Sequence, residues 1–139
     1  ATTGDDTAAT IGDLWAFWAK KIGVVAIVCD GLVRDVSGLL KVDIPVFARG
    51  IKPNSAFKNG PGEVNTTVTC GGVAISAGDI IVGDRDGVVA VPLAQAAQVA
   101  ERLELVKTKE AEAEAKVKEG IKLKFWDPDA LGSRLHYID

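Results

Sequence analysis

The pattern of apolar and polar positions in the first third of the chain predicts a helix followed by a strand. Residues 14–22 combine apolar and helix-forming side chains, and Gly23 after them suits the left-handed backbone that commonly ends a helix. Residues 24–29 are apolar without interruption, which is typical of a strand in a sheet covered on both faces. The next dipeptide, Asp30-Gly31, has the chemistry of a turn. We therefore expect an α/β layer in this part of the chain.

The middle of the chain predicts several short strands separated by turns. Residues 77–79 and 84–87 are turn sequences on either side of an apolar run. We interpret residues 84–87 as a hairpin turn, because they lack the spacing and the terminal glutamate of a calcium loop. The expected strands are residues 45–49, 63–70, 73–75, 80–82 and 88–91. Short strands in succession predict a small β-barrel or a β-sandwich layer.

The last third predicts one long helix over residues 93–119, rich in alanine, glutamate and lysine and ended by Gly120. Its apolar positions recur at steps of three and four residues, and Glu110 lies on that stripe. A carboxylate on a packing seam must reach either solvent or a cation. Glu110 therefore has two interpretations, an exposed helix position or a functional contact with a neighbouring subunit. Residues 125–139 are too apolar for a solvated tail, and we expect them to dock on their own domain or on another subunit.

Composition and charge favour one globular domain over residues 1–139. Hydrophobic residues make up 47% of the chain and charged residues 25%, which is enough for a single core.

The net charge of −3 argues against direct binding of nucleic acid through its phosphates. No apolar run is long enough to span a bilayer, so no membrane partner is expected. Cys29 and Cys70 have neither zinc nor CxxC spacing, and we expect buried free thiols in a reducing cytoplasm.

Two dipeptides, Gly12-Asp13 and Arg34-Asp35, are the strongest candidates for chemistry. The first opens the predicted helix and the second follows the predicted strand, with twenty residues between them. A helix of about ten residues spans roughly 15 Å and a six-residue strand about 20 Å, so the chain returns close to where it started. The dipeptides either face one another across a cleft, or their acidic residues are ordinary loop residues that form no common site. Their spacing alone leaves both interpretations open.

The residue types at these positions suit chemistry on a small 2-oxo acid. Asp35 supplies the oxygen ligand that Mg²⁺ or Mn²⁺ prefers, and Mg²⁺ often uses one or two carboxylates while it retains several waters. Arg34 is unsuited to act as a base, but its planar fork can hold a carboxylate or a developing oxyanion. Asp13 can hold a water on the metal, and the backbone N–H groups of Asp13 and Leu14 can receive an anion. Carbon–carbon cleavage to pyruvate, by retro-aldol reaction or decarboxylation, needs only these parts.

Other candidate sites have weaker signals. No P-loop and no dinucleotide-binding glycine motif occurs in the sequence. His136 is the single histidine, which leaves little support for a histidine-based metal cluster or a Ser-His-Asp triad. The loop of residues 52–62 contains lysines and glycines, and it is either a solvated turn or an anion contact.

In combination, the GD-x20-RD arrangement, the segment DGLVRDV and the later AGDIIVGDRDGVVAVP resemble one known family. This family joins 4-hydroxy-4-methyl-2-oxoglutarate aldolases to the RraA-like regulators of ribonuclease E, and the resemblance extends over nearly the whole chain. It implies an α/β, RraA-like layered fold with a β-barrel-like core, flanking helices and a long C-terminal helix. Family members usually have a substantial segment before the position of Ala1, so we expect this chain to be the C-terminal part of such a protein.

The resemblance also implies a role for each candidate residue. Asp35 would be the direct protein ligand of Mg²⁺ or Mn²⁺, Arg34 would contact the substrate, and Asp13 would order a water on the metal. Glu110 is similar in placement to a family glutamate that completes the metal's water shell from an adjacent subunit, in a homotrimer or a hexamer of two trimers. The backbone wall of the pyruvate site would consist of Gly12, Asp13 and Leu14.

The expected function is that of a divalent-metal-dependent, class II-type aldolase, which is a carbon–carbon lyase. Its expected substrates are 4-hydroxy-4-methyl-2-oxoglutarate or related 4-carboxy-4-hydroxy-2-oxoacids, cleaved to pyruvate, with oxaloacetate decarboxylase activity beside the cleavage. The alternative is a non-catalytic RraA-like protein that inhibits ribonuclease E by contacting it. A transferase acting on a quinone precursor has little support, because no nucleotide-type cofactor signature is present.

Overall fold

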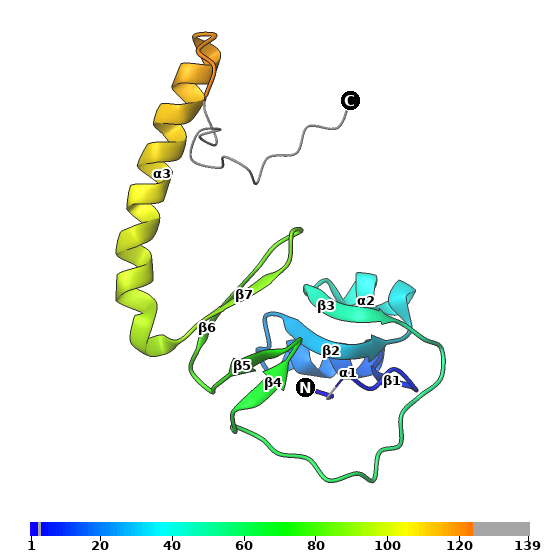
Figure 1. Cartoon of the computed structure of the whole chain (residues 1–139). Helices are drawn as coiled ribbons and strands as arrows, with labels where there is room; N and C mark the ends of the chain where they lie inside the picture. Colours follow the sequence, from blue (N-terminus) through cyan, green and yellow to red (C-terminus); the bar gives the residue numbers. More distant parts are fainter. Residues whose placement is uncertain (3, 124–139) are drawn as a thin grey trace, which may run out of the picture. The chain divides into compact units, whose positions relative to one another are not determined.

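The structure is a computed structural model of the chain, in which residues 1–2 and 4–123 are described (Figure 1). Its contacts divide the chain into two compact units, Ala1–Ala96 and Ala97–Asp139. The expectation of one domain over residues 1–139 stays a prediction. The expected docking of residues 125–139 lies outside the described residues.

A three-stranded parallel sheet forms the centre of the first unit. Its strands are β1 (Ala9–Ile11), β2 (Ile27–Val33) and β3 (Val46–Ile51), and β2 lies between the other two (Figure 1). Helix α1 (Asp13–Lys21) connects β1 to β2, and helix α2 (Val36–Val42) connects β2 to β3. Parallel neighbours require such crossover connections. The predicted α/β layer is confirmed.

Strand β2 differs from its prediction in position and in burial. It runs through Asp30-Gly31, which we expected to form a turn, and buried positions alternate with more exposed ones such as Val28. Tertiary pairing overrides the local turn preference here, because β2 pairs with β3 on both sides of the dipeptide and with β1 beyond it. The dipeptide lies where the register with β3 shifts between Cys29 and Leu32, a place where glycine is common.

Strand β1 and helix α2 are not predicted by the sequence pattern. Strand β1 has three residues in a polar segment, and its neighbours define it, namely β2 on one side and a bridge to Ser55 on the other. Helix α2 has seven residues that include two valines and Gly38, which are weak helix formers. It is stabilised by tertiary packing, because Leu39 and Val42 share one face and are both buried.

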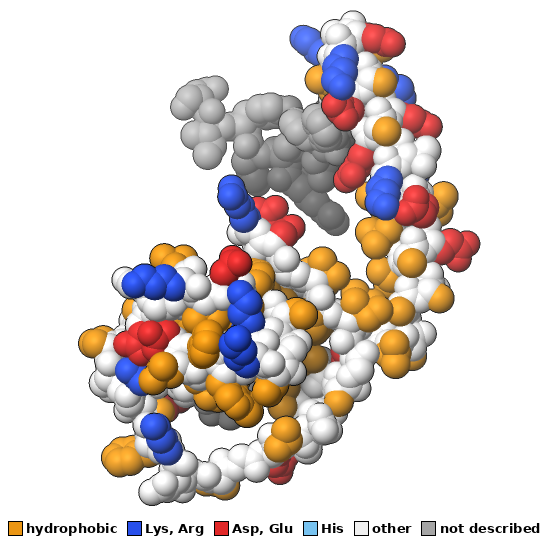
Figure 2. Space-filling view, turned by 180° about the vertical axis from the view of Figure 1, so that it is seen from behind, with side chains coloured by type: hydrophobic (Ala, Val, Ile, Leu, Met, Phe, Trp, Pro, Cys, Tyr) orange, Lys and Arg blue, Asp and Glu red, His pale blue; other side chains and the backbone are white. Residues whose placement is uncertain are grey.

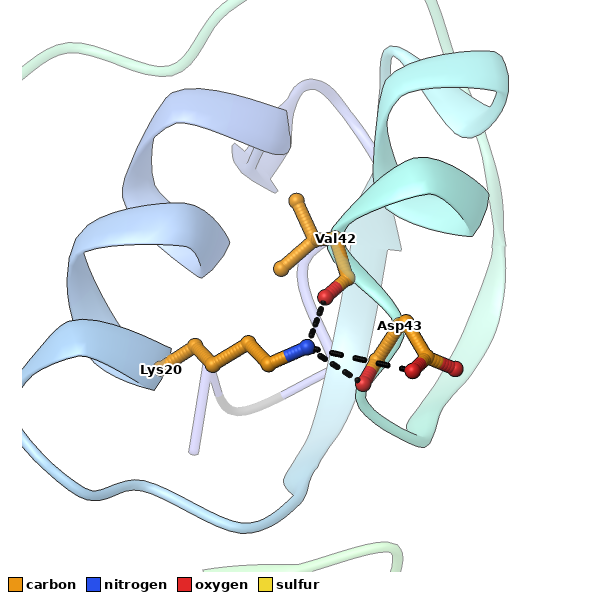
Figure 3. Close-up of polar contacts among 3 residues, drawn as sticks. All are labelled: Lys20, Val42 and Asp43. Carbon is orange, nitrogen blue, oxygen red and sulfur yellow. Dashed lines mark hydrogen bonds and ion pairs between the residues drawn. The ribbon is translucent and has the colours of Figure 1, made fainter.

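The core of the first unit lies where α1, α2 and β2 meet, and its buried cluster consists of Ala16, Ile27, Val33, Leu39 and Val42. Helix α1 buries two alanines and leaves its large side chains about half exposed, namely Trp15, Phe17 and Trp18. At the far end of α1, the Nζ of Lys20 donates hydrogen bonds to the carbonyl oxygens of Val42 at 2.5 Å and Asp43 at 3.0 Å (Figure 3). Lys20 therefore satisfies carbonyl groups that the end of α2 leaves free.

The remaining strands of the first unit form two hairpins. Strand β4 (Val68–Cys70) pairs with β5 (Val73–Ile75) through Gly71-Gly72, and both glycines have the positive φ that this tight turn requires. Strand β6 (Ile80–Gly83) pairs with β7 (Val88–Val91). The side chain of Asp84 accepts hydrogen bonds from the N–H groups of Asp86 and Gly87. The interpretation of residues 84–87 as a hairpin turn is confirmed.

The described strands form one three-stranded and two two-stranded sheets rather than a closed barrel. The expected strand over residues 63–70 is limited to Val68–Cys70. Within the described residues, the α/β layering is therefore confirmed and the β-barrel-like core is not. Both cysteines are free; Cys29 is buried as expected, and Cys70 is only partly buried.

The long helix α3 (Ala96–Lys118) follows the short helix η1 (Leu93–Gln95), and all of it except its first residue belongs to the second unit. The helix ends as predicted, because Gly120 has φ +81° and its N–H donates to the carbonyl oxygen of Val117. Charged side chains of both signs lie along α3 (Figure 2), and Glu110 among them is exposed. In the described part of the chain, no helix combines the length and the apolar character needed to cross a membrane.

Candidate functional site

The two candidate dipeptides lie side by side at one edge of the parallel sheet. Gly12-Asp13 follows β1 directly, Arg34-Asp35 follows β2 directly, and the ends of these strands are paired through Ile11 and Val33. The N–H of Arg34 donates a hydrogen bond of 2.9 Å to the carbonyl oxygen of Ile11. The carboxyl ends of parallel strands are the usual place for ligands in α/β proteins. The dipeptides are therefore neighbours, and the cleft between them stays a prediction.

Gly12 allows this close approach. It is buried, and a Cβ atom at this position would lie 2.7 Å from the Oδ2 of Asp35 and 3.3 Å from the Nε of Arg34. The backbone of Gly12 is extended, so the glycine is required by space rather than by backbone conformation. Any larger residue would push Asp35 and Arg34 away from the start of α1.

Arg34 and Asp35 form an ion pair in which Nη1 lies 2.8 Å from Oδ2, and each side chain is 36% exposed. A pair with this exposure contributes little to stability, at most about 1 kcal/mol. Its main effect is to orient both groups. Among the described residues, the second carboxylate oxygen of Asp35 has no protein partner, and guanidinium N–H groups of Arg34 stay free for a ligand.

Asp35 has a left-handed backbone with φ 57° and ψ 43°, which is unusual for a residue other than glycine. Its carbonyl oxygen accepts hydrogen bonds from the N–H groups of Gly38 and Leu39, so it begins helix α2. Conformations of this kind persist where the surrounding structure enforces them, and they are frequent at functional sites. Here the turn places the carboxylate of Asp35 beside Gly12.

Asp13 is the first residue of α1, where a negative charge is favourable. Its Oδ1 accepts a hydrogen bond of 2.7 Å from the N–H of Leu14, and its side chain lies against Gly38 on α2. The Leu14 N–H therefore already has an acceptor within the chain. Its expected contact with a bound anion stays a prediction.

The carboxylates of Asp35 and Asp13 are of the type that suits a hard divalent cation keeping part of its water shell. In the described ranges, no group of three or more His, Cys, Asp or Glu side chains is placed to hold a metal. Asp35 has a free carboxylate oxygen, and Asp13 lies nearby on α1. One or two carboxylates with several waters are a usual arrangement for Mg²⁺. Glu110 belongs to the other unit, and its contact with a neighbouring subunit stays a prediction.

The first unit has two cavities, of which the smaller reaches Val33 and Val36 on either side of Arg34-Asp35. The larger one, of about 890 Å³, is lined by Cys29, Asp30, Arg49 and Cys70 together with strand and turn residues. The smaller one, of about 570 Å³, lies between α2 and β3. Neither cavity is lined by Gly12, Asp13, Arg34 or Asp35. We place the candidate site at the paired dipeptides, because the charged groups suited to a 2-oxo acid are there.

Comparisons with known proteins identify what the chain is similar to. A relative from Halalkalibacterium halodurans, provisionally named 4-hydroxy-4-methyl-2-oxoglutarate aldolase, is 40% identical over 113 residues. The matched region is 81% of this chain and 52% of that protein. The chain thus spans about half the length of the curated relatives it matches.

Two solved structures have a similar fold. An uncharacterised protein from Pseudomonas syringae matches with a TM-score of 0.80 and 29% identity, over 87% of this chain and 57% of that one. A Streptomyces coelicolor protein, described as an unusual member of the RNase ES inhibitor RraA family, matches with a TM-score of 0.76 and 26% identity. The second match covers 83% of this chain and 59% of that one. The family model for RraA-like proteins, described as Aldolase/RraA, matches residues 1–90, and the chain therefore belongs to the RraA-like family.

Proposed function

We propose that the chain contributes the site of a divalent-metal-dependent aldolase. The proposed substrates are 4-hydroxy-4-methyl-2-oxoglutarate or related 4-carboxy-4-hydroxy-2-oxoacids, which are cleaved to pyruvate, and oxaloacetate decarboxylation is proposed as a second activity of the same site. The observation that supports this most is the close approach of Gly12 to the Arg34–Asp35 ion pair, with Asp13 directly after Gly12 in the chain. The name of the Halalkalibacterium halodurans relative agrees with it. A cytoplasmic location is part of the proposal and agrees with the free thiols.

Arg34 is proposed to bind the substrate. Its Nη1 is engaged by Asp35, which fixes the plane of the guanidinium while other N–H groups point elsewhere. A guanidinium whose plane is fixed in this way can hold a carboxylate with two parallel hydrogen bonds. The same group favours negative charge that develops on the substrate during cleavage.

Asp35 and Asp13 are proposed to hold Mg²⁺ or Mn²⁺, Asp35 directly and Asp13 through water. When bound, the cation would supply an electrophile for the 2-oxo acid. Asp35 is kept in place by its backbone turn and by Arg34, so its carboxylate needs no rearrangement to bind. Asp13 is kept in place by the start of α1 and by the surface of α2.

The central test measures pyruvate release from each substrate class by the full chain with Mg²⁺ or Mn²⁺. Arg34→Ala should lower turnover by about 10²–10³-fold, the usual loss when a donor to a developing oxyanion is removed. Asp35→Ala should abolish the metal dependence. Exposed residues of the β6–β7 turn give matched controls, Arg85→Ala and Asp86→Ala, which should leave release unchanged. Near-normal release by either site variant would remove the role assigned to that residue.

Glu110 is proposed to act from an adjacent subunit of a trimer or hexamer. Glu110→Ala should then weaken Mn²⁺ binding in the assembled protein and have no effect on a dissociated chain. Glu112→Ala on the same helix is the control, because that side chain is also exposed. Equal affinities for the two variants would assign Glu110 to the solvated surface.

A second candidate is a non-catalytic inhibitor of ribonuclease E. The likeness to the Streptomyces coelicolor member of the RNase ES inhibitor family favours it. Capture of ribonuclease E by the full chain, together with calorimetry in which neither Mg²⁺ nor Mn²⁺ binds, would support this candidate and exclude the aldolase.

A further inference from the structure

Gly38 lies in the first turn of α2, where glycine is an unfavourable choice. Helix α2 has only seven residues, and glycine is among the weakest helix formers. The backbone does not require it, because Gly38 is absent from the described residues that have positive φ. Its surroundings therefore have to explain it.

The space that a side chain at position 38 would need is filled by Asp13. A Cβ atom built on Gly38 would lie 2.5 Å from the Cβ of Asp13 and 2.6 Å from its Cγ, and it would also overlap Oδ2. Real Cβ atoms essentially never come within 3.0 Å of another heavy atom. Rotation of the Asp13 side chain would not remove the overlap, because its Cβ is itself too close.

The two helices have little freedom to separate and make room. Their shared core contains Ala16, Leu39 and Val42, and Lys20 joins the end of α1 to the end of α2. A side chain at position 38 would therefore displace the first turn of α1, which includes Asp13 and adjoins Gly12. Gly12, the residue directly before that turn, lies against Asp35.

We propose that Gly38 is a positioning residue for Asp13, in that its missing side chain lets the Asp13 carboxylate lie against α2 beside Arg34-Asp35. The inference rests on the proposed function for what Asp13 does there. Gly38 does not touch the substrate or the metal. It acts through Asp13, and the sequence pattern gave no signal of it.

The test is a double-mutant cycle in the full chain with Gly38→Ala, Asp13→Gly and the pair, using Mn²⁺ alone as the probe. Gly38→Ala should weaken Mn²⁺ binding by about 10- to 100-fold, as is usual when a neighbour that orients a ligand is changed. It should also lower Tm. In the Asp13→Gly background, the same change should raise Tm, because the overlap is gone and alanine favours the helix. In the Asp13→Gly background, Gly38→Ala should cause no further loss of Mn²⁺ affinity.

Ser37→Ala is the matched control, because Ser37 is the exposed neighbour of Gly38 on α2 and its change to alanine also favours the helix, by a smaller amount. It should leave Mn²⁺ affinity unchanged. Folded Gly38→Ala protein with wild-type Mn²⁺ affinity would overturn the proposal. An equal fall in Tm with and without Asp13 would overturn it as well. If the unaltered chain binds no Mn²⁺ and releases no pyruvate, the proposed function fails, and the Tm cycle still decides whether Gly38 sets the position of Asp13.

Discussion

Asp35 combines an unusual backbone conformation with the charge that the proposed site needs. Its left-handed turn starts α2 and directs the carboxylate toward Gly12, where Arg34 holds one of its oxygens. Aspartate tolerates this conformation better than most residues, because its short polar side chain can interact locally. The residue type therefore satisfies both the fold and the proposed chemistry.

Substitutions at Asp35 should separate these two contributions. Asp35→Gly and Asp35→Ala both remove the carboxylate, but only alanine keeps the steric conflict of a left-handed backbone. Urea denaturation should therefore find the glycine variant more stable than the alanine variant by about 1 kcal/mol. At Lys41, an exposed position inside α2, the alanine variant should instead be more stable than the glycine variant. Equal stability of the two Asp35 variants would contradict the left-handed turn.

Asp30 should make stability depend on pH in the acid range. Burial raises the pKa of this carboxyl, but hydrogen bonds from the N–H and hydroxyl of Thr2 and from the N–H of Gly71 outweigh it. The resulting pKa lies below the ordinary 3.8. A lowered folded pKa means that the carboxylate stabilises the fold above about pH 4 and loses this effect as pH falls through the folded value.

Asp30→Ala should accordingly lower Tm at pH 7, and the difference from the unaltered chain should shrink below pH 4. Thermal denaturation, monitored by circular dichroism at several pH values, measures this difference in Tm. Asp6→Ala serves as a control, because its exposed side chain has no hydrogen bond or ion pair among those found in the described residues. If the difference in Tm between Asp30→Ala and the unaltered chain stays constant with pH, the ionised form of Asp30 does not stabilise the fold.

At the scale of elements, the structure separates what local sequence determines from what tertiary contacts determine. The two hairpins and the end of α3 are predictable, because Gly71-Gly72, Asp84 and Gly120 specify their turns locally. Strand β1 and helix α2 are not predictable, since pairing with β2 and burial of Leu39 and Val42 stabilise them. The same division applies to the site. The spacing of Gly12-Asp13 and Arg34-Asp35 made their proximity one of two interpretations, and the pairing of β1 with β2 decides for it. Gly38 is recognised only through its contact with Asp13.

The contact between Lys20 and the end of α2 should contribute measurably to the packing of the two helices. Lys20→Met keeps the length of the side chain and removes the donors to the carbonyl oxygens of Val42 and Asp43. Because the lysine side chain is 43% exposed, we expect a loss of about 1 kcal/mol in the free energy of unfolding. Lys41→Met is the control on α2 and should have no comparable effect. An unchanged midpoint in urea for Lys20→Met would mean that water replaces the contact.

At the scale of the whole molecule, burial is concentrated in a small part of the chain. The buried hydrophobic residues of the described chain all belong to β1, α1, β2 and α2. Many large apolar side chains are exposed, and Figure 2 shows hydrophobic side chains over the surface of the first unit. Exposed apolar area of this kind usually marks a surface that another polypeptide covers. This agrees with the proposal that the active form is an assembly.

The assembly itself is testable by sedimentation velocity over a range of protein concentrations. A trimer or hexamer should persist at concentrations where pyruvate is released, and specific activity should fall on dilution as the assembly dissociates. Full activity in a chain that sediments as a monomer at every concentration would contradict the contribution of an adjacent subunit.

The burial of alanines in α1, with its tryptophans turned outward, gives the chain a built-in optical probe. Trp15 and Trp18 are 48% and 57% exposed, so their fluorescence in the single chain should be red-shifted and open to quenching by iodide. In a Trp126→Phe variant these two residues are the whole tryptophan signal. If a second chain covers this helix in the assembly, the emission will shift to the blue and iodide will lose access. The same helix that begins with Asp13 would then report, without any label, when the surface beside the proposed site is covered.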